Sequence, residues 1–167
     1  MTPKTKQAHS LILATDPVLS TLTDAVTRIL VDIGQQVLPP MFIRGIGEAL
    51  RQLHVSPPGA VFVCTSRQEV ESGAAIIDQL HRRLPQMPML AVAEHHDEHV
   101  ERSVRVAGAT YYFPLEGAQD EQQLRRALQM LGMAKPAAPP GAARSPPRPP
   151  VRRRSRVRDG PPRTYQS

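Results

Sequence analysis

The chain has few cysteine and aromatic residues and no long apolar run. Of its 167 residues one is Cys and none is Trp, and Tyr and Phe together make up 4%. A single Cys excludes an internal disulfide and a cysteine-rich zinc site. The longest apolar runs have about five residues, far short of the ~20 that cross a bilayer, and Leu11–Ala14 is too short for a signal-peptide core. We therefore expect a soluble cytoplasmic protein.

Excess positive charge is confined to the last part of the chain. Residues 134–167 contain 9 Lys/Arg, one acidic residue and 9 of the 18 Pro, whereas residues 1–133 carry 12 Lys/Arg and 14 Asp/Glu. The net charge of +6 therefore does not belong to a uniformly basic nucleic-acid-binding domain. We predict a flexible N-terminus over residues 1–9, one domain over residues 10–133 that needs no disulfide or metal to bury a core, and a disordered tail over residues 134–167.

The tail has almost no large apolar residues, so we predict an extended, partly polyproline segment. Its arginine cluster suits anionic partners such as nucleic acid, an acidic protein or a membrane surface. Only Tyr165 offers an aromatic ring, so base stacking is not indicated. A spacer and a binding arm both remain open. The cluster consists of Arg152, Arg153, Arg154, Arg156 and Arg158.

Short apolar runs alternate five times with amphipathic segments. The runs predict strands over 10–14, 36–38, 60–64, 89–93 and 110–113, although Pro39 and Pro40 weaken the second strand. Asp16 and Pro17 begin the first helix, Gly34 and Gly108 end helices, and Asp120 is expected to cap the last one. The alternation predicts an α/β fold, with a five-stranded parallel sheet in the flavodoxin-like order 2-1-3-4-5 and helices on both faces.

The carboxyl ends of the predicted strands carry few residues of the types that catalyse reactions or bind ligands. In such a sheet, functional side chains gather at this edge. Here the edge holds Ala14–Asp16, Cys64–Ser66, Ala93–His95 and Phe113–Glu116, with no Lys and no paired carboxylates. No catalytic set is indicated.

Two segments carry a family resemblance. The run RRLPQMPMLAVAE and the run VRVAGATYYFPLE resemble the fourth and fifth strands, with their approaches, of the receiver domain of bacterial two-component response regulators. The spacing from Gly73 to Pro88 to Gly108 matches the family without gaps. The resemblance covers about Ser10 to Met133, and it implies the receiver fold and a place in a phosphorelay pathway.

The pocket that the resemblance implies is degenerate. Receivers bind Mg²⁺ with an acidic pair after strand one, accept phosphate on an Asp after strand three, and use a Thr or Ser and a Lys after strands four and five. One Asp does not replace three carboxylates around Mg²⁺. We therefore expect a pseudo-receiver with no metal, no cofactor and no enzymatic activity. The corresponding positions are Ala14 and Thr15 (leaving only Asp16), Thr65 or by a second count Cys64, Ala93, and Leu115.

The resemblance also implies a partner-binding face. In receivers an aromatic on the fifth strand lies in the signalling face formed with the fourth helix, and Tyr112 aligns with it, near His99 and Glu116. We expect an adaptor that acts through protein contacts, with a homodimer as a further option. The alternative is a nucleic-acid-associated regulator that binds through its basic tail.

Three further features have a plain reading and a sharper one. Cys64 reads as a buried structural thiol or as a reactive one. The run Glu94–His99 reads as a solvated helix start, as a metal site, or as a pH-sensitive partner surface. Gly45 and Gly47 read as the turn at the start of a helix or as part of a dinucleotide-binding motif. The motif is disfavoured because a third glycine and a clean preceding strand are missing.

Overall fold

The computed structural model describes residues 9–133. The predicted flexible N-terminus and basic tail lie outside the described residues, apart from His9. In chain order the elements are β1 (His9–Ala14), the 3-10 helix η1 (Pro17–Leu19), α1 (Ser20–Asp32), β2 (Gln36–Val37), β3 (Met41–Phe42), α2 (Ile46–Val55), β4 (Ala60–Thr65), α3 (Val70–Arg83), β5 (Met89–Ala93), α4 (Glu98–Ala107), β6 (Tyr111–Pro114) and α5 (Ala118–Met130).

The sheet is parallel and runs in the order β2-β1-β4-β5-β6, with β3 also paired to β1. Because β2 pairs with the start of β1 and β3 with its end, the two form one interrupted edge strand. The predicted 2-1-3-4-5 order is thus confirmed, but the predicted second strand is too short. Pro39 and Pro40 have no backbone N–H, so they interrupt the ladder between the two halves.

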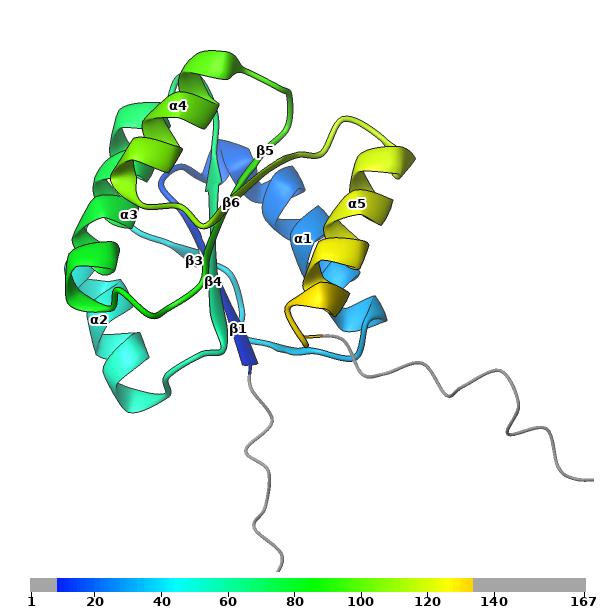
Figure 1. Cartoon of the computed structure of the whole chain (residues 1–167). Coiled ribbons are helices and arrows are strands. Elements are labelled where there is room, and N and C mark those ends of the chain that lie inside the picture. Colours follow the sequence, from blue (N-terminus) through cyan, green and yellow to red (C-terminus); the bar gives the residue numbers. More distant parts are fainter. Residues whose placement is uncertain (1–8, 134–167) are drawn as a thin grey trace, which may run out of the picture. The chain divides into compact units, whose positions relative to one another are not determined.

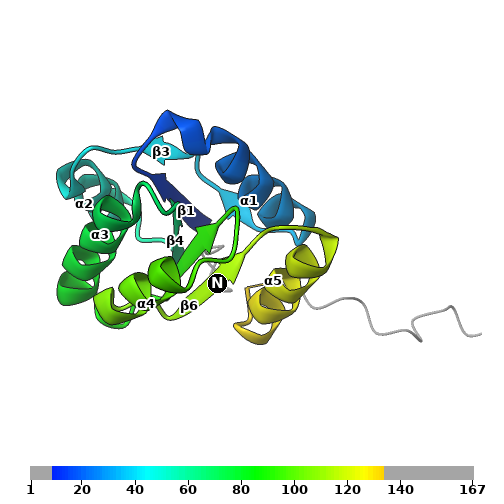
Figure 2. The same cartoon turned by 90° about the horizontal axis from the view of Figure 1, so that it is seen from above.

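Helices cover both faces of the sheet, with α2, α3 and α4 on one side and α1 and α5 on the other (Figures 1 and 2). Alternate residues of β1 point into the two cores: Leu11 and Leu13 face the first group, and Ile12 and Ala14 the second. Every residue of β4 is buried, as a central parallel strand requires. None of the helices in residues 9–133 is long and apolar enough to cross a membrane.

Three of the four predicted helix ends are confirmed. The Asp16 carboxylate accepts the N–H of Val18 at 2.8 Å and caps η1, and Gly34 and Gly108 follow α1 and α4 with positive φ. The prediction for Asp120 was wrong: α5 begins after the extended Gly117, so Asp120 lies in its first turn. There Asp120 Oδ2 accepts the N–H of Glu116 at 3.0 Å.

Candidate functional site

The positions of the degenerate pocket converge at the carboxyl edge of the sheet. In the register of neighbouring strands, Ala14 pairs with Cys64, and Thr65 pairs with Ala93. The Leu115 N–H donates to the carbonyl of Ala93 at 2.8 Å, so the end of β6 joins the same edge. The strand ends therefore lie side by side, in the arrangement that the sequence predicted.

Cys64 and Thr65 occupy opposite faces at the end of β4. Cys64 is buried in the core under α1 and α5, and this burial raises the pKa of its thiol to about 12. The thiol is therefore protonated at neutral pH and a poor nucleophile, which favours the structural reading. Thr65 is buried as the last residue of β4, and an added Cβ on Gly73 of α3 would lie 2.7 Å from its Oγ1. Neither side chain is a carboxylate.

The residues after β1 do not form an acidic pair, and their side chains bond to the start of η1 and to Glu69. Asp16 caps η1, as described, and Thr15 Oγ1 donates to Glu69 Oε2 at 2.9 Å. Glu69 immediately precedes α3 and thereby brings a carboxylate to the end of β1. The sequence analysis did not select Glu69, because 54 residues separate it from Thr15 and no motif joins them.

Leu115 stands at the position that holds Lys in receivers. Its side chain is half-buried and packs against the core under α1 and α5. An apolar side chain at this place provides packing and no positive charge. Ala93, at the position of the receiver hydroxyl, is buried.

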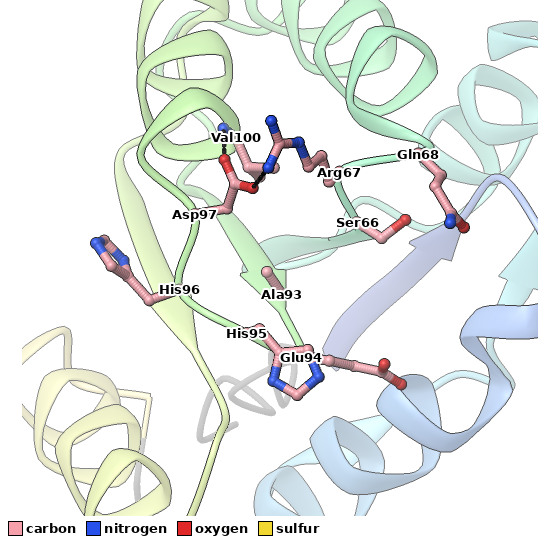
Figure 3. Close-up of a pocket in the computed structure, with 9 residues that line it drawn as sticks. All are labelled: Ser66, Arg67, Gln68, Ala93, Glu94, His95, His96, Asp97 and Val100. Atoms are coloured by element: carbon pink, nitrogen blue, oxygen red, sulfur yellow. Dashed lines mark hydrogen bonds and ion pairs between the residues drawn. The ribbon is translucent and has the colours of Figure 1, made fainter.

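A cavity of about 390 Å³ lies between the β4–α3 loop and the β5–α4 loop, with Ala93 between them (Figure 3). Arg67 of the first loop pairs with Asp97 of the second at 3.6 Å. His95 and His96 point to different sides of the β5–α4 loop in this view. The lining residues are Ser66, Arg67, Gln68, Ala93, Glu94, His95, His96, Asp97 and Val100.

Asp97 caps α4 and organises one wall of this cavity. Its Oδ1 accepts the N–H groups of His99 at 2.9 Å and Val100 at 3.1 Å. The bond from Val100 does most to hold the pKa of Asp97 below its ordinary value; the bond from His99 and the charge of Arg67 act in the same direction, and partial desolvation opposes them. Asp97 is therefore an ionised cap at neutral pH.

Tyr112 holds the β5–α4 loop from the other side. Its side chain is buried, its hydroxyl accepts the N–H of Asp97 at 3.2 Å, and the hydroxyl donates to the carbonyl of His95 at 3.4 Å. Its ring lies 6.1 Å from that of His96, centroid to centroid. Burial raises the pKa of Tyr112, so the hydroxyl keeps its proton and can donate.

The three residues of the predicted partner face lie around this loop. Tyr112 is mostly inside, whereas His99 and Glu116 are exposed. Glu116 Oε1 accepts the N–H of His96 at 2.8 Å and lies 3.7 Å from His95 Nδ1. Within residues 9–133 no three His, Cys, Asp or Glu side chains are placed to hold a metal ion. Gly45 directly precedes α2, as the plain reading predicted, whereas Gly47 lies inside the first turn of that helix and not in the turn before it.

A scan against family models and a search of curated proteins found no match for this chain. Solved structures do resemble it. A CheY-like protein (tadZ) from Pseudomonas aeruginosa gives a TM-score of 0.63 at 20% identity, covering 78% of this chain and 98% of its own. A putative pilus assembly-related protein from Burkholderia pseudomallei gives 0.59 at 16% identity, covering 77% and 92%. A response regulator from Thermotoga maritima gives 0.55 at 16% identity, covering 74% and 97%.

These similarities confirm the predicted fold. The described chain has the receiver-type, flavodoxin-like arrangement of a parallel sheet between two layers of helices. At 16–20% identity they establish the fold and leave function to be argued from the site.

Proposed function

We propose that the protein is a phosphorylation-independent, receiver-like signalling module of a two-component-type pathway. In this proposal it works through protein–protein contacts and catalyses no reaction. Its support is the receiver fold combined with an edge that has Ala14, Thr15, Thr65 and Leu115 where receivers carry their carboxylates and Lys. One structural neighbour, at 12% identity and a TM-score of 0.53, is described as an atypical orphan response regulator with a phosphorylation-independent regulatory mechanism.

One observation carries the proposal. The hydroxyl of Tyr112 bridges the Asp97 N–H and the His95 carbonyl, and the ring is buried. The start of α4 is thus fixed to β6 by side-chain bonds that involve no phosphate. A signalling face built on α4 and β6 would therefore have a set shape without a phosphodonor.

We place the docking face on the exposed side of α4 and the β6–α5 loop. His99 and Glu116 are exposed there and are the proposed contact residues. Tyr112 lies behind them and acts as a positioning residue. Two neighbours are described as pilus assembly proteins, from Burkholderia pseudomallei and, at a TM-score of 0.55, Burkholderia thailandensis. We therefore include components of pilus assembly among the partner classes to be tested.

The test is capture of a partner by the full chain, with matched charge changes on two faces. His99→Glu with Glu116→Lys alters the proposed face. His54→Glu with Glu48→Lys makes the same changes at exposed sites of α2, among helices that cover the first core. We expect the first pair to abolish capture, the second to leave it intact, and acetyl phosphate to have no effect. Capture that needs acetyl phosphate, or that survives the first pair, would contradict the proposal.

The charge of residues 134–167 favours a second candidate, a nucleic-acid-associated regulator. These residues carry 9 Lys/Arg against one acid, including the run Arg152–Arg158. Binding by such a run weakens steeply with salt because it releases condensed counterions. A salt-dependent nucleic-acid gel shift that disappears when the chain ends before Lys135 would support this candidate. Specific partner capture by residues 1–133 would support the first.

A further inference from the structure

The β5–α4 loop, Glu94–Asp97, is fastened from two sides. From β6, Tyr112 bonds to the main chain at His95 and Asp97. From the β4–α3 loop, Arg67 pairs with the side chain of Asp97. A further connection, made by Glu116 of the β6–α5 turn, joins two side chains whose charges depend on pH.

The main chain of Glu116 is fixed by a hydrogen bond of its own, in addition to the contacts that its side chain makes with the loop. Its N–H donates to Asp120 Oδ2 at 3.0 Å, which fixes the turn between β6 and α5. Its Oε1 then accepts the N–H of His96 at 2.8 Å. The same oxygen lies 3.7 Å from His95 Nδ1, beyond hydrogen-bond distance but within reach of an ion pair. With a neutral imidazole, the carboxylate therefore holds the loop by one bond to the main chain.

We propose that Glu116 and His95 form a pH-dependent latch that tightens the β5–α4 loop against the β6–α5 turn when His95 takes up a proton. The proton comes from solvent and no covalent bond changes. The imidazolium adds a charged contact to an oxygen that already binds the adjacent N–H. Imidazole groups change charge near neutrality, well above the range in which exposed carboxylates do so.

The His95–Glu116 pair lies among other charged side chains on the elements around it. The titratable and charged groups that face this region are Glu94, His96, Asp97, Glu98 and His99 on the loop and the start of α4, Tyr112 on β6, Glu116 and Asp120 in the β6–α5 turn and the start of α5, and Arg67 on the β4–α3 loop.

A regulatory role of the latch rests on the proposed function, because the latch would act on the proposed docking face. His99 and Glu116 belong to the proposed docking face, so a tighter loop at mildly acid pH would make that face more rigid. The latch itself is measured on the protein without any partner. Failure of the latch and failure of the docking proposal are therefore separate results.

The experiment follows amide exchange of the full chain by NMR at pH 7.5 and pH 6.0. Protection factors compare each rate with that of an unstructured chain at the same pH, which removes the intrinsic pH dependence. We expect the protection factor of the His96 amide to rise about 1.5- to fivefold at pH 6.0, the range that an exposed ion pair gives. Glu116→Gln keeps an acceptor for the His96 N–H but has no charge, and His95→Gln removes the titrating ring. In both variants the rise should vanish.

His54→Gln is the matched control, because His54 is an exposed histidine at the end of α2. This variant should retain the full rise. An unchanged His96 protection factor in the unaltered protein would overturn the latch. A rise that persists in His95→Gln would also overturn it, and would assign the effect to another histidine of the run.

Discussion

Tyr112 contributes both to the core and to the shape of the β5–α4 loop. Its ring fills the core under α3 and α4, with 7% of the residue exposed, and its hydroxyl ties the start of α4 to β6. An aromatic with a polar end suits a position that is apolar at its base and faces backbone groups at its tip. The Tyr112 hydroxyl is therefore one of three side-chain connections that hold the β5–α4 loop, beside those of Arg67 and Glu116.

Removing that oxygen should loosen the loop without emptying the core. Tyr112→Phe deletes the acceptor for the Asp97 N–H and the donor to the His95 carbonyl. We expect a loss of about 1 kcal/mol in the free energy of unfolding, the usual contribution of such bonds, measured by urea denaturation. Tyr111→Phe is the control, because no side-chain hydrogen bond of Tyr111 is found among the described residues and its ring is partly exposed. Equal losses in the two variants would contradict the role given to Tyr112.

Asp97 should make the protein sensitive to acid. The folded state lowers its pKa, chiefly through the Val100 N–H, so the ionised cap stabilises the fold above the pKa of the unfolded chain, near 4. This contribution is lost as pH falls through the lower pKa of the folded state. Asp97→Asn should be less stable than the unaltered protein at pH 7, and the difference should shrink towards pH 3. Thermal melts between pH 3 and pH 7 measure it, and a constant difference would contradict the assignment.

Leu115 should matter for stability and not for phosphate chemistry. Its side chain packs against the core under α1 and α5. Leu115→Lys should cost about 1–2 kcal/mol, because the Lys stem keeps part of the contact while the ammonium must reach water. Leu115→Met, which nearly conserves volume, should cost less. Urea denaturation ranks the variants. Mg²⁺-dependent phosphorylation of Leu115→Lys alone would show that the pocket positions are misassigned.

Helix α3 packs so closely against β4 that the position of Gly73 leaves no room for a side chain. An added Cβ at Gly73 would lie 2.7 Å from Thr65 Oγ1 and 3.0 Å from Thr65 Cβ, and Thr65 is fixed in a fully buried strand. Gly73→Ala should therefore destabilise the protein by about 1–3 kcal/mol, although alanine favours helices.

Two variants make the test of Gly73 specific. Gly47→Ala in α2 meets nothing within 4 Å and should be neutral or slightly stabilising. Thr65→Ala combined with Gly73→Ala removes the nearer of the two contacts and should recover part of the loss. A stabilising effect of Gly73→Ala alone, seen in the midpoint of urea unfolding, would show that α3 can shift away from β4.

The order of the elements could be predicted from the sequence, because apolar runs and helical periodicity are local signals. The fourth strand was predicted with its observed bounds, and the helix after Asp16 with its cap. The split edge strand was missed: two residues at Met41 and Phe42 give too short a pattern to recognise beside Pro39 and Pro40. Asp120 was misassigned because an extended glycine also begins a helix without any side-chain cap.

The site could be predicted as positions but not as contacts. Alignment with receivers placed Ala14, Ala93 and Leu115 at one edge, and the strand register brings them there. The bonds that replace the missing carboxylates were not foreseen. The bond between Thr15 and Glu69 spans 54 residues, and that between His96 and Glu116 spans 20. Such partners are brought together by the fold and leave no pattern in the sequence.

The receiver fold of residues 9–133 has a carboxyl edge that is stabilised by its own side chains. Arg67, Tyr112 and Glu116 connect three of the loops at the carboxyl edge, the place where receivers respond to phosphate. At the positions where receivers carry their acidic pair and phosphoacceptor, the chain has one carboxylate, Asp16, which is already engaged as a helix cap. We therefore expect these positions to lack the oxygen ligands that would hold a divalent metal and a phosphate together.

Amide NMR spectra of the full chain, recorded with and without Mg²⁺ and a beryllofluoride phosphate mimic, test whether the carboxyl edge responds to phosphate. We predict that resonances of the carboxyl-edge loops stay unchanged at concentrations that saturate an ordinary receiver. A triple variant with Thr15→Asp, Thr65→Asp and Leu115→Lys supplies the minimum set of missing groups for comparison. Stoichiometric binding of the mimic by the unaltered chain, lost in Asp16→Ala, would contradict the claim that this receiver fold works without phosphorylation.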